Sequence, residues 1–313
     1  MGRLSRAPRM VLVLSECWTM VSPRELRALV DMAVAAEDAG FDAVMLSEHV
    51  VLGADADAAG LMANPREYAL PGNQEPAMPW PDSQTLLAAI AARTTALRLF
   101  AAAIIAPLRH PLALAKSLAT LDVLSEGRLV VLPTPSWHEA EYEALAVPFA
   151  ERGRRLDEHL AAWRAAWGPS PACFSGRHYR FDGVYVEPKP WRDSGVALHF
   201  GSSTLHDRLI ERVVRYGSGL NPLGRISHAD LERLFAAMRA AGRDPDELEL
   251  VGGTRARFPD ERSVADLGEA LAAIPEQMAD GFTTFCLKPS QFTDDAAAVP
   301  ALCREVIARV GSL

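Results

Sequence analysis

The segment AEDAGFDAVMLSEH, from Ala36 to His49, shows the pattern from which the architecture follows. Its first residues end an amphipathic helical segment, and Gly40 supplies the helix stop. Phe41–Ser47 (FDAVMLS) is a short apolar run typical of a buried β-strand. Glu48 and His49 follow it directly. The stretch therefore predicts a helix, a buried strand and a polar strand end in succession.

The same alternation of strand and helix repeats along the chain. The expected strands are Met10–Ser15, Phe41–Ser47, Leu97–Ile105, Arg128–Leu132, Val196–Phe200, Ser218–Asn221, Leu248–Gly252 and Thr283–Leu287. The expected helices cover residues 22–40 (with Ser22 as N-cap and Pro23 in the first turn), 82–95, 110–124, 138–145, 151–167, 204–216, 227–241, 263–278 and 294–310.

Eight strand-then-helix units in 313 residues predict a (β/α)8 TIM barrel of the α/β class. Buried parallel strands are near-continuous apolar runs, and each needs a crossover to return. No GxGxxG motif follows the first strand, which argues against an open dinucleotide-binding sheet. We expect residues 1–313 to form a single domain.

Two stretches interrupt the alternation. Residues 50–81, after the second strand, are rich in Pro, Gly and Asn and predict a lid-like insertion. Residues 173–191 contain alternating aromatic residues about two glycines, which predicts a hairpin-like insertion between the fourth helix and the fifth strand.

Composition restricts the function classes. The formal net charge is −8, with no basic tract, so nucleic acid is not an expected partner. No apolar run approaches the roughly 20 residues that span a bilayer, so no membrane association is expected, and the basic N-terminus lacks the apolar core of a signal peptide. We therefore expect a cytoplasmic protein. The four cysteines form no CxxC pair and no His cluster has zinc spacing, so no metal site is predicted.

In a TIM barrel the active site collects at the C-terminal ends of the strands. Those ends nominate residues 15–18, 48–49, 106–110, 133–137, 201–203, Asn221, 254–257 and Lys288. Glu48 beside His49 is the sharpest candidate, because an imidazole carries protons near neutral pH and a carboxylate can orient it. The alternative is a polar strand end that is hydrogen-bonded for structure alone.

Residues 201–203 (Gly-Ser-Ser) open a predicted helix. Free backbone N–H groups at a helix start favour an anion, and glycine lets a phosphate approach closely. The alternative is an ordinary helix N-cap. Arg255 and Arg257 could assist an anion or stay solvated, and Trp137 could wall an aromatic ring or pack for structure.

Several segments together resemble the luciferase-like flavin monooxygenases, in particular the branch of coenzyme F420-dependent oxidoreductases. The matching segments are residues 36–49, 107–111 with 115–116, 118–129, 141–154, 176–190, 201–203 and 221–224. They cover nearly the whole chain in the right order.

The resemblance implies FMN or coenzyme F420 at the C-terminal end of the barrel. His49 would lie beside the ring of the cofactor. Its binding residues would be Ala103, Pro107, Thr134, Trp137, Gly201, Ser202 and Ser203, of which the last three would hold the phosphate. The walls of the substrate pocket would include Trp18, Trp80 and Asn221. Relatives are commonly dimers, so a homodimer is expected.

Three hypotheses follow. The first is a flavin- or deazaflavin-dependent oxidoreductase or monooxygenase that acts on a small organic substrate by hydride transfer or oxygen activation, with His49 and Glu48 as catalytic residues. The second is a cofactor-free barrel with non-redox acid–base activity or a partner-subunit role, motivated by Pro133 and Pro135 where relatives usually have a glycine-rich run. The third, ranked last, is a phosphosugar lyase or isomerase, for which Lys288 is the one candidate lysine.

Overall fold

The structure is a computed structural model and describes residues 7–313. Eight strands close a barrel in the order β1-β10-β9-β8-β7-β4-β3-β2, and every neighbouring pair is parallel. They are β1 (Arg9–Val13), β2 (Ala43–Leu46), β3 (Arg98–Ile105), β4 (Leu129–Thr134), β7 (Ala197–Phe200), β8 (Gly219–Leu220), β9 (Glu249–Gly253) and β10 (Thr284–Leu287). The predicted TIM barrel is confirmed.

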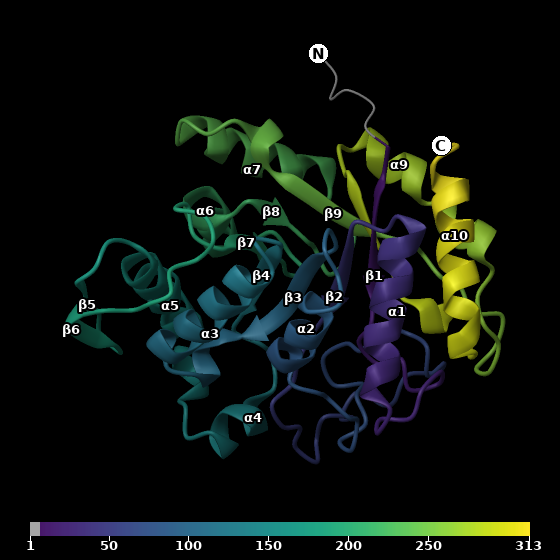
Figure 1. The fold of residues 1–313 in the computed structure, drawn as a ribbon, viewed down its shortest axis with the longest axis horizontal. Helices are drawn as coiled ribbons and strands as arrows, with labels where there is room; N and C mark the ends of the chain where they lie inside the picture. Colours follow the sequence, from purple (N-terminus) through teal and green to yellow (C-terminus); the bar gives the residue numbers. More distant parts are fainter. Residues whose placement is uncertain (1–6) are drawn as a thin grey trace.

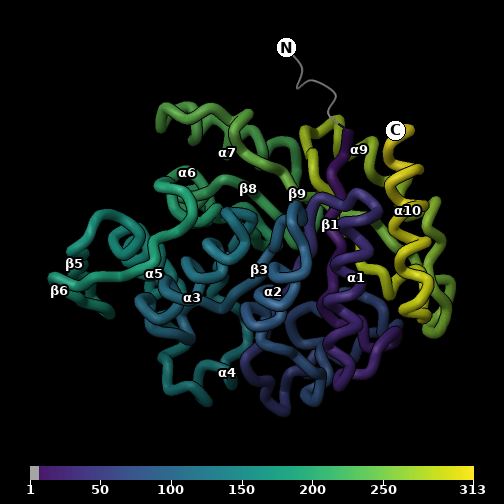
Figure 2. The backbone as a smooth tube through the Cα atoms, in the orientation of Figure 1, coloured from purple at the N-terminus to yellow at the C-terminus, as the bar shows by residue number. Residues whose placement is uncertain are grey.

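Helices follow the barrel strands and pack around their outside (Figures 1 and 2). They are α1 (Leu26–Ala39), α2 (Ser83–Ala91), α3 (Pro111–Leu124), α4 (Glu139–Ala144), α5 (Arg152–Trp167), α6 (Asp207–Tyr216), α7 (His228–Ala240), α8 (Leu267–Leu271), α9 (Ile274–Ala279) and α10 (Val299–Val310). Short 3-10 turns lie at Ala106–Leu108, Phe149–Glu151, Pro245–Glu247, Pro289–Gln291 and Ala296–Ala298.

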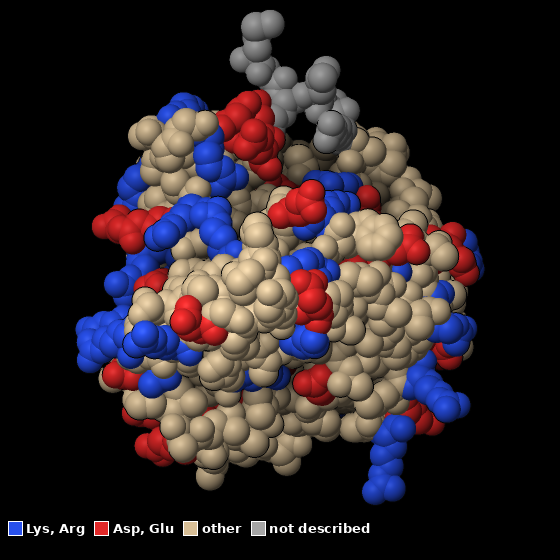
Figure 3. Space-filling model, turned by 60° about the vertical axis from the view of Figure 1, so that its left-hand side comes forward, with Lys and Arg blue, Asp and Glu red and all other residues tan. Residues whose placement is uncertain are grey.

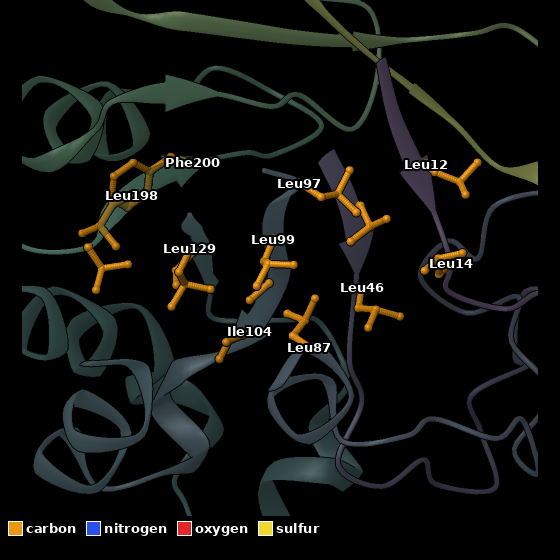
Figure 4. Close-up of a cluster of buried hydrophobic side chains, with 14 of the residues drawn as sticks. Leu12, Leu14, Leu46, Leu87, Leu97, Leu99, Ile104, Leu129, Leu198 and Phe200 are labelled. Carbon is orange, nitrogen blue, oxygen red and sulfur yellow. The ribbon is translucent and has the colours of Figure 1, made fainter. Parts of the chain in front are cut away.

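The period-two alternation of each strand divides the apolar residues between two cores. On β1, Val11 and Val13 face the barrel interior, where they pack with Phe100. Leu12 belongs to the larger core between the strands and the surrounding helices. Figure 4 shows this outer core, with Leu12 among its labelled side chains. Both faces of the strands are buried, which explains their near-continuous apolar sequences.

The first helix begins later than predicted. The expectation that Ser22 is the N-cap and Pro23 the first helical residue is wrong, because residues 22–25 form a separate turn. The backbone N–H of Glu25 donates to the carbonyl oxygen of Ser22 at 2.8 Å, and α1 starts at Leu26. Gly40 ends α1 at a φ of 97°, as predicted.

Side-chain caps decide where other helices begin. Asp82 accepts a hydrogen bond from Thr85 N at 2.7 Å and caps α2, as predicted, although α2 ends at Ala91 rather than at residue 95. The helix expected from residue 204 starts at Asp207, because Nδ1 of His206 caps it by accepting from Leu209 N. The helices expected from residues 263 and 294 begin at 267 and 299.

Both insertions lie where the sequence predicted them. The second is an antiparallel hairpin of β5 (Ala172–Ser175) and β6 (Arg180–Val184). The first, residues 50–81, contains no helix or strand and lies at the same end of the barrel as α4, at the bottom of Figure 1. The Asn64 side chain fastens it to the β9–α8 loop by donating to the carbonyl oxygens of Asp260 and Ser263 at 3.0 and 2.9 Å.

The surface carries charges of both signs. On the face shown in Figure 3, lysine and arginine side chains are interspersed with aspartate and glutamate. Within residues 7–313, no helix combines the length and the apolar character needed to cross a membrane.

Candidate active site

His49 lies just beyond the C-terminal end of β2 and is only 9% exposed. Its Nδ1 lies 3.2 Å from Oε2 of Glu141, on α4. Glu141 is fully buried, and its other oxygen accepts hydrogen bonds from the backbone N–H groups of Val50 at 2.5 Å and Val51 at 3.3 Å. One carboxylate therefore orients the imidazole and fixes the start of the 50–81 insertion.

The prediction that Glu48 orients His49 is wrong. Successive residues at a strand end point in opposite directions, and the Glu48 side chain turns toward β3 and α2. Its carboxylate binds both terminal nitrogens of Arg109 at 2.7 and 3.0 Å and accepts from Ile105 N at 2.9 Å and Ser83 Oγ at 3.2 Å. Glu48 thus stabilises the barrel rim, which was the structural alternative for this residue.

Two indoles and an amide surround His49. The ring centres of Trp80 and Trp137 lie 5.2 and 5.9 Å from that of His49, both edge to face. Gln74, from the middle of the insertion, brings its Nε2 to 3.4 Å from Nε2 of His49. The structure thus brings together His49, Trp80 and Trp137, all three nominated from the sequence.

Unpaired polar atoms gather in this region. Among residues 7–313, the buried atoms Trp80 Nε1 and Gln74 Oε1, on two side chains that contact His49, have no hydrogen-bond partner. Buried polar side chains are normally satisfied, so such a set beside one histidine indicates a site that receives a polar ligand or water.

A buried ion pair lies at the ends of β1 and β10. Nζ of Lys288, which is 0% exposed, lies 3.8 Å from Oε2 of Glu16 and donates to the carbonyl oxygen of Glu67 in the insertion at 2.8 Å. Burial raises the pKa of the Glu16 carboxyl, while the charges of Lys288 and then His49 oppose that shift. The two strand ends were nominated from the sequence, but the pairing was not.

Three predicted cofactor residues lie on β3, directly after β3 and at the end of β4, and they differ in burial. Ala103 is only partly buried and packs against the interior core, next to a register shift between Ala102 and Ile104. Pro107 is buried in the 3-10 turn that follows β3. Thr134 is partly exposed at the end of β4, and its hydroxyl accepts from Ser136 N at 3.2 Å.

The predicted phosphate segment, Gly201–Ser203, does not open a helix, because α6 starts at Asp207. It is a loop whose backbone N–H groups at positions 201, 202 and 203 donate to no group within residues 7–313. Gly201 is required for packing: an added Cβ would overlap the carbonyl oxygen of Asn221. Asn221 lies beside this loop, where its backbone N–H donates to the carbonyl oxygen of Phe200 at 2.8 Å.

Trp18 contacts the insertion one residue before Trp80. Its indole N–H donates to the carbonyl oxygen of Pro79 at 3.1 Å, so it fastens the end of the insertion. Pro133 lies within β4, and Pro135 follows that strand. The Tyr142 hydroxyl of α4 fixes Pro135 by donating to its carbonyl oxygen at 2.5 Å.

The sequence did not predict the contacts by which His138 and Glu141 hold the insertion and the histidine. Nε2 of His138, which is 1% exposed, accepts from the backbone N–H of Gly53 at 2.6 Å. His138 is the N-cap residue of α4 and Glu141 lies three residues later in the first turn of that helix, so the start of α4 supplies both side chains. That spacing after the fourth strand is the one signal that could have nominated Glu141; nothing in the sequence marks Gln74.

The pKa values of two thiols near the strand ends disfavour the nucleophilic thiolate form. All four cysteines are free, and burial raises the pKa of Cys17 to about 11 and that of Cys286 to about 12. Within residues 7–313, no group of three or more His, Cys, Asp or Glu side chains is arranged to hold a metal ion.

Comparison with known proteins identifies the family. The model of the luciferase-like monooxygenases matches residues 9–298. The chain belongs to the luciferase-like monooxygenase family. This family member is 35% identical over 205 residues to an uncharacterized protein of Mycobacterium tuberculosis, covering 64% of this chain and 71% of that protein.

Two further relatives carry functional names. The FMNH2-dependent dimethylsulfone monooxygenase of Pseudomonas putida is 29% identical over 207 residues, covering 64% of this chain and 56% of that protein. The F420-dependent glucose-6-phosphate dehydrogenase of Nakamurella multipartita is 29% identical over 264 residues, covering 80% and 70%. A solved F420-dependent secondary alcohol dehydrogenase, at 16% identity, shares the fold with a TM-score of 0.71 over 97% of this chain and 99% of that chain.

Proposed function

We propose that this enzyme is an oxidoreductase or monooxygenase that uses FMN or coenzyme F420 on a small organic substrate. The family match supports the reaction class. The relatives include one enzyme named for FMNH2 and one named for F420, so both cofactors stay in the proposal.

The residues around His49 fit a polar aromatic ring. Trp80 and Trp137 are partly exposed indoles, and the unpaired Trp80 Nε1 and Gln74 Oε1 offer one donor and one acceptor. The free backbone N–H groups of residues 201–203 suit a phosphate oxygen. They lie in a loop before α6, so the helix dipole does not add to this binding. When bound, the cofactor would supply hydride transfer or oxygen activation.

One observation carries the proposal: a buried imidazole lies at the mouth of the barrel with a buried carboxylate on Nδ1 and two indoles beside it. Glu141 keeps the proton on Nδ1, so His49 meets a substrate through Nε2, where it can accept and return a proton. The 50–81 insertion excludes water from this histidine, because it contains Gln74 and Trp80, which both contact the ring.

Binding titration is the decisive experiment. Purified protein would be titrated with FMN and with coenzyme F420, oxidised and reduced, by visible absorbance and tryptophan fluorescence. We expect one of them to bind, with Trp80 and Trp137 emission quenched. His49→Asn should retain binding and lose turnover. Absence of binding by every form would refute the proposal.

A cofactor-free acid–base enzyme is the second candidate, favoured by the buried Glu16–Lys288 pair close to His49. The same titration separates the two, because the second candidate predicts no binding. The proposed enzyme is a single domain that contains both insertions, forms a homodimer and is located in the cytoplasm. Partial proteolysis tests the single domain, and sedimentation tests the homodimer.

A further inference from the structure

Both ring nitrogens of His49 are engaged. A carboxylate oxygen accepts hydrogen bonds, and Glu141 already accepts from two backbone N–H groups, so the proton shared with His49 belongs to Nδ1. In the neutral ring Nε2 then carries a lone pair. The atom that lies 3.4 Å from it is the amide nitrogen of Gln74, which donates.

The Gln74 amide is placed with its nitrogen toward the imidazole, which suits the lone pair on Nε2. Its Oε1 must then face away from the imidazole, and this oxygen is buried without a partner among residues 7–313. The Gln74 side chain is 3% exposed, so water does not replace the missing contact freely. Gln74 therefore covers the one nitrogen through which His49 can exchange a proton, and it retains an unused acceptor.

The backbone of the insertion holds Gln74 over the ring. Gln74 N donates to the carbonyl oxygen of Ala56 at 3.0 Å, and Ala59 N donates to that of Gly72 at 2.6 Å. Asn73 Oδ1 accepts from Leu70 N at 2.6 Å and closes the turn. The backbone is therefore fixed, and the side chain of Gln74 is the part that can move.

We propose that Gln74 is a positioning residue that covers Nε2 of His49, and that a substrate reaches this nitrogen by displacing the Gln74 amide with an O–H or N–H group of its own. The substrate class follows from the tautomer, because a lone pair on Nε2 recognises a hydrogen-bond donor. The unused Gln74 oxygen then provides an acceptor for a second donor on the same substrate. This inference rests on the proposed role of His49.

Chemical modification tests the cover without a known substrate. Diethyl pyrocarbonate reacts with the unprotonated nitrogen of histidine, and mass spectrometry of peptides reports the rate at His49 separately from the other histidines. Gln74→Ala should raise that rate at pH 7 about tenfold, since one hydrogen bond no longer competes for the lone pair. Glu75→Ala, the exposed neighbour of Gln74 in the chain, is the matched control and should stay within about twofold of the natural protein.

An equal rate at His49 in the natural protein and in folded Gln74→Ala overturns the proposal. Should Gln74→Ala not fold, nitrogen-15 NMR of the natural protein decides, with His49→Asn used for assignment. A proton on Nδ1 and none on Nε2 supports the cover, and a proton on Nε2 overturns it. Neither measurement needs a cofactor, so failure of the FMN and F420 titrations refutes the proposed function independently.

Discussion

Replacing Glu48 with alanine separates stability from catalysis. In the structure Glu48 contacts Arg109 at the rim of the barrel, and it is Glu141 that contacts His49. We therefore expect Glu48→Ala to unfold more easily while His49 keeps its orientation. The variant loses both Arg109 hydrogen bonds and leaves the buried N–H of Ile105 without its acceptor.

The magnitude follows from the burial of the pair. Removing one partner of a buried ion pair costs about 3–5 kcal/mol, and the Arg109 side chain is 23% exposed, which lets water reach it and favours the lower value, about 3 kcal/mol. With an unfolding entropy of about 2.1 cal/mol/K per residue, 313 residues give about 0.66 kcal/mol/K. The melting temperature should therefore fall by about 4–5 °C.

Thermal unfolding followed by circular dichroism measures the shift. Arg109→Met and the double variant complete a cycle, and the two single effects should not add because both remove the same contact. The rate of His49 modification by diethyl pyrocarbonate should equal that of the natural protein. A melting temperature within about 1 °C of the natural value, or a changed His49 rate, would refute the assignment of Glu48 to the rim.

Three further predictions use other parts of the barrel. Glu141→Gln weakens the contact that orients the His49 ring, so kcat should fall by on the order of 100-fold with KM little changed, as steady-state kinetics would show. Burial lowers the pKa of His199 to about 4, so the folded protein keeps this ring neutral while the unfolded chain, with a pKa near 6.5, binds a proton. Stability is therefore full above pH 6.5 and falls by roughly 3 kcal/mol as the pH drops toward 4; urea titrations of His199→Gln should show a flatter decline. Gly201→Ala forces a Cβ against the carbonyl oxygen of Asn221 and should cost about 2 kcal/mol of unfolding free energy, and an unchanged urea midpoint would contradict that close approach.

The barrel was predictable because its strands are buried on both faces. A strand such as β4 must be apolar throughout, and each crossover helix leaves its own amphipathic pattern. Helix starts were less predictable where several polar residues compete. Ser22-Pro23 has the composition of a helix start, yet the Glu25 side chain accepts from Ser22 N and helps close a turn before α1.

In the candidate site, the position of His49 was predictable from its own strand, but the partners of its side chain, which are distant in sequence, were not. The position of His49 follows from β2 alone, since a residue just beyond a barrel strand must lie at the mouth. The partners of its side chain do not follow from β2. Glu141 comes from α4, 92 positions along the chain, and Gln74 from an insertion without helix or strand.

Adjacency in sequence favoured Glu48 as the partner of His49, and adjacency is misleading at the end of a strand. Alternation sends neighbouring side chains to different surroundings, so a carboxylate next to a histidine in sequence is poorly placed to contact its ring. A carboxylate on the helix after β4 can approach from outside the strand and meet the ring from the side. The same geometry lets Glu141 bind the backbone of Val50, so the orientation of the imidazole and the attachment of the insertion depend on one side chain. Loss of Glu141 should therefore disturb both together, whereas loss of Gln74 should expose His49 and leave the insertion attached.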